Sequence, residues 1–189
     1  MKHTWQVTLI LALLFLLSHF VGLIIVDNYL PKTLPTGEVI EKELPLSIER
    51  PEIEEKTSFI PIFFIILIST ILALILIKFQ LLNLWKFWFF ISIFLTLTIA
   101  FSAFIPQIYS IVISVILALL KLFKSNIISN NLVEIFIYGG LAAIFVPLFN
   151  LLSISILLIL ISAYDFYSVF KSKHMIKLAK IGPRLVINS

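Results

Sequence analysis

The stretch that decides the fold runs from Phe87 to Leu120 and reads FWFFISIFLTLTIAFSAFIPQIYSIVISVILALL. Its 34 residues carry no charge. As a single helix they would measure about 51 Å, well beyond the roughly 30 Å of bilayer hydrocarbon. The Pro106–Gln107 pair interrupts the run. We therefore predict two membrane-spanning helices joined by a turn at this pair.

Three further uncharged runs extend this pattern along the chain. Trp5 to Val26 is long enough for one span, and it lacks a small-x-small cleavage pattern that would mark a removed signal peptide. Phe59 to Ile77 gives another span. The run from Ile135 to Tyr164 is broken by Pro147 and Asn150 and gives two more. The sequence therefore predicts six transmembrane helices.

Composition agrees with a membrane protein and excludes a soluble domain. Hydrophobic residues make up 61% of the chain and charged residues only 13%, with a mean hydropathy of +1.15. That is about half the usual share of charge, too little to cover a surface in water. The absence of cysteine excludes a disulfide framework and a thiolate metal site. We predict an all-α integral membrane protein whose partner is the lipid bilayer and not a nucleic acid.

The charges predict how the chain crosses the membrane. Eight of the ten acidic residues lie between Asp27 and Thr57, a proline-rich polar stretch, whereas ten basic residues flank the apolar runs. Basic residues prefer the cytoplasmic ends of spans, so both termini are predicted to be cytoplasmic, in a multi-pass protein of the cell membrane. The expected segments are a first span (1–26), an acidic extracytoplasmic loop (27–57), spans two to four (58–130), spans five and six (131–170) and a basic cytoplasmic tail (171–189).

Asp165 is the acidic residue that this pattern does not explain. It follows the last uncharged run and precedes Lys171 by six residues, which places it about 9 Å inside the membrane boundary. An acid within a span usually faces the bundle interior or a wet cavity and is a functional candidate. The alternative is a structural acid that reaches the interface or bonds, as a neutral group, to the hydroxyl of Ser162 or Ser168.

Two motifs resemble the presenilin and signal-peptide-peptidase family of intramembrane aspartyl proteases, in particular its archaeal members. The segment from Tyr164 to Met175 reads YDFYSVFKSKHM, with a Tyr-Asp pair at the end of the sixth span and a basic segment after it. Upstream, GGLAAIFVPL from Gly139 to Leu148 resembles the family's fifth span. The resemblance implies a presenilin-like N-terminal bundle, with Asp165 as one of two catalytic aspartates and Tyr164 supporting it. It also implies that the substrates are transmembrane helices.

The rest of the family's active site is missing from the sequence. The second aspartate belongs to a Gly-x-Gly-Asp motif, and a Pro-Ala-Leu motif completes the site, but neither occurs in the 189 residues. We therefore expect an N-terminal half, from a truncated frame, a split gene or a fragment, that is inactive alone. Its expected partner is a complementing C-terminal half with spans seven to nine.

Two alternatives and several weaker candidates remain open at this point. The chain could be a degenerate member that binds transmembrane helices without cutting them, or a small transporter or channel subunit.

His19 is expected to be a neutral residue facing the bundle. Glu134 is expected to sit at the inner start of the fifth span, beside the positive end of the helix dipole. Gly139–Gly140 is expected to allow close helix approach or a bend. No metal ion and no cofactor are expected.

Overall fold

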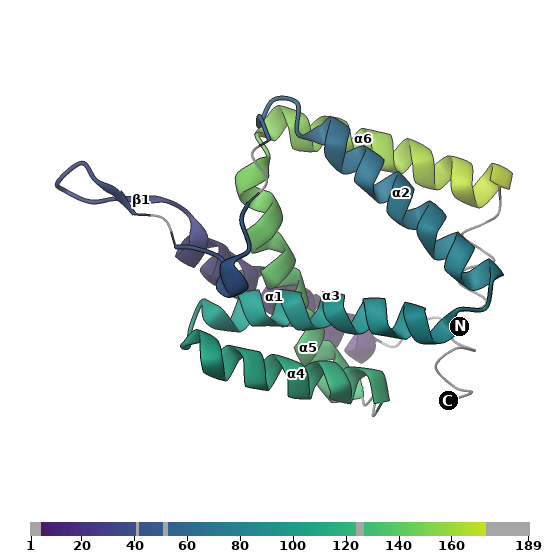
Figure 1. The fold of residues 1–189 in the computed structure, drawn as a ribbon, viewed down its shortest axis with the longest axis horizontal. Coiled ribbons are helices and arrows are strands. Elements are labelled where there is room, and N and C mark those ends of the chain that lie inside the picture. Colours follow the sequence, from purple (N-terminus) through teal and green to yellow (C-terminus); the bar gives the residue numbers. More distant parts are fainter. Residues whose placement is uncertain (1–4, 41, 51–52, 124–126, 173–189) are drawn as a thin grey trace. The chain divides into compact units, whose positions relative to one another are not determined.

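The computed structural model describes residues 5–40, 42–50, 53–123 and 127–172. The predicted basic tail lies almost wholly outside the described residues, as do residues 1–4 (Figure 1). The long helices are α1 (Trp5–Tyr29), α2 (Phe59–Lys78), α3 (Leu82–Ser102), α4 (Gln107–Phe123), α5 (Ile127–Phe145) and α6 (Leu151–Tyr167). Short elements are the strands β1 (Lys32–Thr33) and β2 (Val39–Ile40), the 3₁₀ turns η1 (Pro45–Ser47) and η2 (Val146–Leu148), and the π-helical turn η3 (Ser168–Ser172).

The all-α membrane fold is confirmed. Within the described residues, α1, α2, α3, α5 and α6 are long and apolar enough to cross a membrane, whereas α4 is apolar but has only 17 residues. The predicted turn at Pro106 lies between the end of α3 and the start of α4. The predicted break at Pro147 and Asn150 separates α5 from α6. The count of six spans and the cytoplasmic termini stay predictions.

Large apolar side chains cover the outside of these helices. Phe20 on α1 is 64% exposed, Ile68 on α2 63% and Leu151 on α6 84%. In water such surface would be costly, whereas lipid tails match it. The exposed surface is therefore the surface of a multi-pass membrane protein.

The chain divides into two compact units, which are described separately below. The first comprises Met1–Pro51 and Phe89–Pro147, and the second comprises Glu52–Trp88 and Leu148–Ser189.

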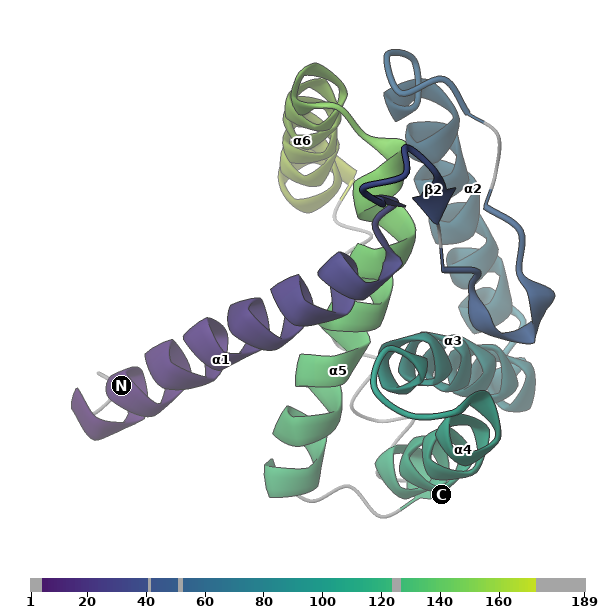
Figure 2. The ribbon, with the colours of Figure 1, turned by 90° about the vertical axis from the view of Figure 1, so that its left-hand side faces the viewer.

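In the first unit α1 crosses α5 where glycines replace side chains (Figure 2). A Cβ atom at Gly22 would lie 3.9 Å from the Cα of Gly139, so the two backbones are close. On α5, a Cβ atom at Gly140 would overlap the carbonyl oxygen of Thr96 on α3. The expectation of close helix approach at Gly139–Gly140 is therefore confirmed.

A second contact in the same unit joins α3, α4 and α5. Leu97 and Ala118 are fully buried there, and Val133 is 1% exposed. The rings of Phe101 and Phe136 stack with their centroids 4.6 Å apart. Together with the glycine contact, this packing fixes α5 from both sides.

The predicted loop (27–57) is more ordered than its composition suggests. α1 continues to Tyr29 instead of ending at Val26, and β1 and β2 form an antiparallel hairpin whose turn contains Gly37 at φ +84°. Positive φ costs glycine little. Leu44 is only 5% exposed and belongs to the core of the unit. This part of the loop therefore packs on the first unit instead of being fully solvated.

Basic side chains of the loop bond to the end of α3 and to α1. The Lys42 ammonium donates to the Ser102 carbonyl at 2.7 Å and lies 5.5 Å from the centroid of the Tyr29 ring. The Tyr29 hydroxyl donates to the Ile99 carbonyl at 2.8 Å, and Arg50 donates to the Tyr29 carbonyl at 3.0 Å. A cation at a helix C-terminus also complements the helix dipole. The acidic loop is held in place by its few basic residues.

In the second unit α2 packs on α6 at their N-terminal ends. Ile62 of α2 contacts Leu148 and Leu157 in one cluster. The Ser153 hydroxyl of α6 donates a hydrogen bond to the Glu55 carbonyl just before α2. Figure 1 shows that the two helices start together and diverge toward their C-terminal ends. Their contact is therefore made at one end.

Candidate active site

Asp165 and Tyr164 lie near the C-terminal end of α6, inside the candidate span Leu151–Phe170. The helix starts at a defined point because the Asn150 side chain accepts a hydrogen bond from the Ser153 backbone at 2.8 Å. Such an N-cap satisfies one of the backbone donors left open at a helix start. The cap therefore fixes the residue at which α6 begins.

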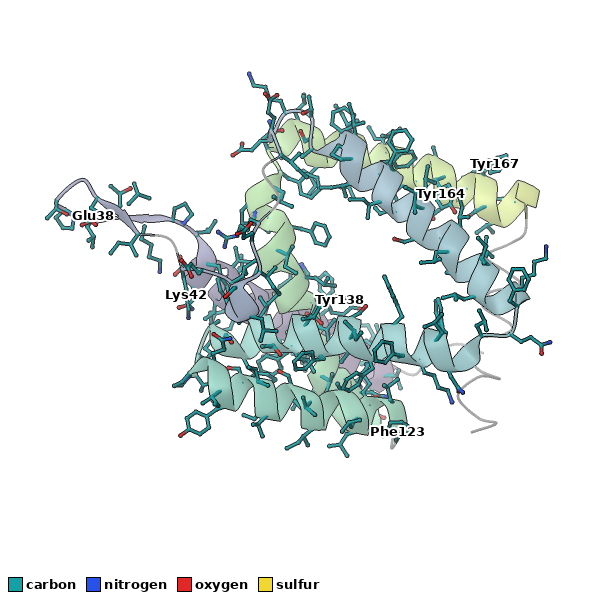
Figure 3. All side chains as sticks on the ribbon, in the orientation of Figure 1. Glu38, Lys42, Phe123, Tyr138, Tyr164 and Tyr167 are labelled. Carbon is teal, nitrogen blue, oxygen red and sulfur yellow. The ribbon has the colours of Figure 1, made fainter. Side chains whose placement is uncertain are left out.

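The buried side of α6 is a stripe with helical spacing. Ser153 and Leu157 are buried, and Ile161 packs against the same cluster. Tyr164 continues this stripe and is half-buried, and Figure 3 shows it with Tyr167 near the end of the helix. Asp165 is one residue further, which rotates it by about 100° to the flank of the stripe.

Asp165 is exposed in this structure. Apolar residues and Tyr164 occupy the stripe that faces α2, and the expectation that Asp165 faces the bundle interior or a wet cavity stays a prediction. An exposed carboxyl on a span is expensive in lipid. A further group that covers it would remove this cost.

The serines predicted to bond the Asp165 carboxyl do not do so here. Ser162 is exposed. Ser168 is fully buried, and its hydroxyl donates to the backbone carbonyl of Asp165 at 3.0 Å. The Ser168 backbone N–H is shared between the carbonyls of Asp165 and Tyr164, and the helix changes there from α to π. Isolated π turns are often found at functional sites.

Two other acids lie within candidate spans, and both are paired. Asp27 in the last turn of α1 accepts from Lys32 at 2.9 Å. Glu134 accepts from Lys121 of α4 at 2.9 Å, with the lysine side chain only 11% exposed. Asp165 belongs to neither of these ion pairs. It therefore differs from both in position and in bonding.

Glu134 is not at the start of its helix. α5 begins at Ile127, so Glu134 lies two turns inside it and away from the dipole end that was expected to hold it. The expectation is wrong because Lys121 supplies a partner that lets the carboxylate remain within the helix. The sequence offered one signal for this pair, a lysine and a glutamate on either side of the turn between two spans.

The remaining predictions from the sequence concern His19 and the absence of a metal ion and a cofactor. His19 is exposed on α1, and its Nδ1 lies 3.0 Å from the Phe15 carbonyl. The expectation that His19 is a neutral residue facing the bundle stays a prediction. In the described part of the chain no group of three or more His, Cys, Asp or Glu residues could hold a metal ion. The absence of a cofactor stays a prediction.

Comparison with known proteins gives one match. A family model described as signal-peptide peptidase, presenilin aspartyl protease matches residues 10–186, which is nearly the whole chain. No curated protein and no solved structure matches. The matched range contains α1 from residue 10 onward, all of α2 to α6 and both residues of the Tyr164–Asp165 pair.

Proposed function

Because the chain belongs to the signal-peptide peptidase and presenilin aspartyl protease family, we propose that it supplies one of the two catalytic aspartates of an intramembrane protease. That aspartate is Asp165. The observation that carries the proposal is its position, exposed within the last candidate span and directly after Tyr164 on the inward stripe. The proposed substrates are transmembrane helices.

The chemistry explains why one aspartate is not enough. Two carboxyls placed close together cannot easily both ionise, so they share a proton. The ionised one takes a proton from the attacking water, and the protonated one polarises the carbonyl of the peptide bond. Asp165 is exposed and can meet a second carboxyl, whereas Asp27 and Glu134 are occupied by lysines.

The second carboxyl has to come from another chain segment. The sequence contains no Gly-x-Gly-Asp and no Pro-Ala-Leu. We propose that a complementing partner with spans seven to nine provides them. The diverging C-terminal ends of α2 and α6 leave Asp165 uncovered within the second unit, which suits such a partner (Figure 1).

Co-expression with a second chain that carries both missing motifs tests the proposal. Cleavage of a reporter transmembrane substrate should appear only with both chains. Asp165→Asn should lower the rate by about 10²–10⁴-fold, the usual contribution of a positioned acid or base, because the amide cannot accept the proton. Tyr164→Phe should have a milder effect, because the hydroxyl positions the acid without replacing it.

Asp27→Asn is the matched control, since it removes another span-end carboxylate and should leave cleavage unchanged. Pull-down of the partner by the Asp165→Asn chain confirms that assembly survives. A wild-type cleavage rate from the assembled Asp165→Asn pair would show that Asp165 is structural.

A second candidate function is a proteolytically inactive protein that binds transmembrane helices. The missing Gly-x-Gly-Asp favours it for the chain in isolation. The same assay separates the two functions. Helix binding without cleavage, in the presence of a partner that carries both motifs, would support the inactive protein.

A further inference from the structure

We propose that a groove between α1 and α5 binds a membrane phospholipid whose head carries a primary ammonium group. The groove has a volume of about 540 Å³ and lies entirely within the first unit. Its walls include Leu14 and Phe15 of α1 and Ile135 of α5. Both helices are candidate membrane spans, so the groove is within reach of lipid.

The helix crossing explains where the groove lies. α1 and α5 approach at Gly22 and Gly139, and every groove residue precedes one of these glycines on its own helix. The two helices diverge from the crossing toward their N-terminal ends, as Figure 2 shows. Glycine at the crossing thus brings the helices close enough to bound a groove beside it.

The polar lining of the groove has one charged group, the Glu134 carboxylate, and four groups that can donate: Ser18, His19, Asn131 and Tyr138. Glu134 is a carboxylate that is 47% exposed and bonds to Lys121 through Oε1. His19 lies near the Phe15 carbonyl through Nδ1. A carbonyl oxygen can only accept, so Nδ1 donates in this contact. Tyr138, labelled in Figure 3, adds a hydroxyl that is able to donate or accept.

These groups select the head of the ligand. A carboxylate with one exposed edge favours a cation that can donate, which a primary ammonium does and a choline group cannot. The described lining residues of the groove offer no cation to an anionic head, and Lys121 beside it is 11% exposed and already paired. Glu134 lies about 6 Å along the helix from Asn130, where the candidate span starts, so a lipid head can reach it.

The volume and the apolar lining of the groove indicate that the ligand also carries an acyl chain. A groove of about 540 Å³ is in the range of small-molecule sites and far too small for a whole helix. Leu14, Phe15 and Ile135 offer apolar contact to an acyl chain. The Tyr138 hydroxyl can donate to an ester carbonyl. One phospholipid satisfies both the walls and the polar groups.

Competition between lipids tests the proposal on the purified chain. Nanodiscs would contain equal amounts of dioleoyl phosphatidylethanolamine, phosphatidylcholine and phosphatidylglycerol, and native mass spectrometry after detergent extraction would measure which lipid stays bound. The ethanolamine lipid should be enriched about tenfold over the choline lipid, the scale of one charge-assisted hydrogen bond.

Two variants assign that enrichment to the groove. Glu134→Gln should bring the ethanolamine-to-choline ratio close to one, whereas Glu38→Gln on the exposed hairpin should not change it. Leu14→Trp should fill the groove and reduce retention of the ethanolamine lipid while leaving the Lys121 ion pair intact. Leu16→Trp, at a position that is 63% exposed and outside the groove, is its control.

The proposal is overturned if the wild type retains the three lipids equally or prefers the glycerol lipid. It is also overturned if Leu14→Trp leaves the preference intact. Dimerisation that is abolished by Leu14→Trp, without any lipid preference, would assign the groove to a second copy of the chain.

Discussion

The two helix pairs of this protein are held in different ways. α1 and α5 approach backbone against backbone at Gly22 and Gly139, in the C-terminal half of each helix. α2 and α6 meet at one end, through apolar side chains and the Ser153 hydroxyl, and then diverge. The two pairs differ in what makes the contact. Backbone against backbone leaves no side chain that can adjust, whereas a pair held by side chains at one end can open at the other. The candidate catalytic Asp165 lies on the pair that can open.

The largest loss of stability is expected for a substitution at Gly140, where the backbones of α5 and α3 are in close contact. Gly140→Ala places a Cβ atom against the Thr96 carbonyl, and neither group can move without shifting a helix. We expect the free energy of unfolding to fall by about 3 kcal/mol, the upper end of the cost of overpacking. Thermal unfolding in detergent micelles measures it.

Gly22→Ala is the control for this substitution, because its Cβ atom would make an ordinary contact at 3.9 Å. The loss there should stay well below that of Gly140→Ala. Equal losses at the two positions would mean that the contact in the first unit is looser than described.

A smaller loss of stability is expected for a substitution in the contact between α2 and α6. Leu157→Ala removes a side chain that is 6% exposed and packed on Ile62 and Leu148. The expected loss is about 2 kcal/mol, at the low end for such truncations, because the remaining space is near lipid. The neighbouring Leu158, 59% exposed, gives the matched Leu158→Ala control, which should change stability little.

Spin labels at the C-terminal ends of α2 and α6 would report whether the pair opens further. The chain has no cysteine of its own, so introduced cysteines can be labelled selectively. Leu157→Ala should broaden the distance distribution, whereas Leu158→Ala should not. An unchanged distribution in Leu157→Ala would show that this contact does not hold the pair.

The smallest loss of stability is expected for Lys42, the loop residue that bonds to the end of α3. Lys42→Met keeps the length of the side chain but removes the hydrogen bond to the Ser102 carbonyl. A loss of about 1 kcal/mol is expected. Lys32→Met, which breaks only an exposed ion pair with Asp27, should lose less. If the two variants unfold alike, the loop contributes nothing to holding α3.

The sequence predicted the breaks between helices better than their ends. The turn at Pro106 and the start of α6 after Asn150 were readable because proline and a capping side chain act locally. Charge was a poorer guide. It suggested that a span ends where a charged residue occurs, yet α1 runs past Asp27 to Tyr29, and α5 starts seven residues before Glu134. Both carboxylates find a lysine, which only the folded chain reveals.

For the candidate site, the sequence placed Asp165 on the last described long helix but not its direction. α6 is apolar all round, with Leu158 59% and Ile159 69% exposed, so no pattern distinguished the side facing α2 from the side facing lipid. Packing of Leu157 against α2 decides the direction and leaves Asp165 on the flank. The catalytic role of Asp165 stays a prediction.

The hydrogen bond from Ser153 to Glu55 has a consequence for biosynthesis. The two residues are 98 positions apart. At about 5–20 residues per second, a ribosome needs roughly 5–20 s to pass from one to the other. For part of that time α2 has been made but the helix on which it packs has not. A delay in translation before Ser153 would prolong this exposure, so the interval in which quality-control proteases can recognise an unpaired α2 is set by the order of the residues along the chain.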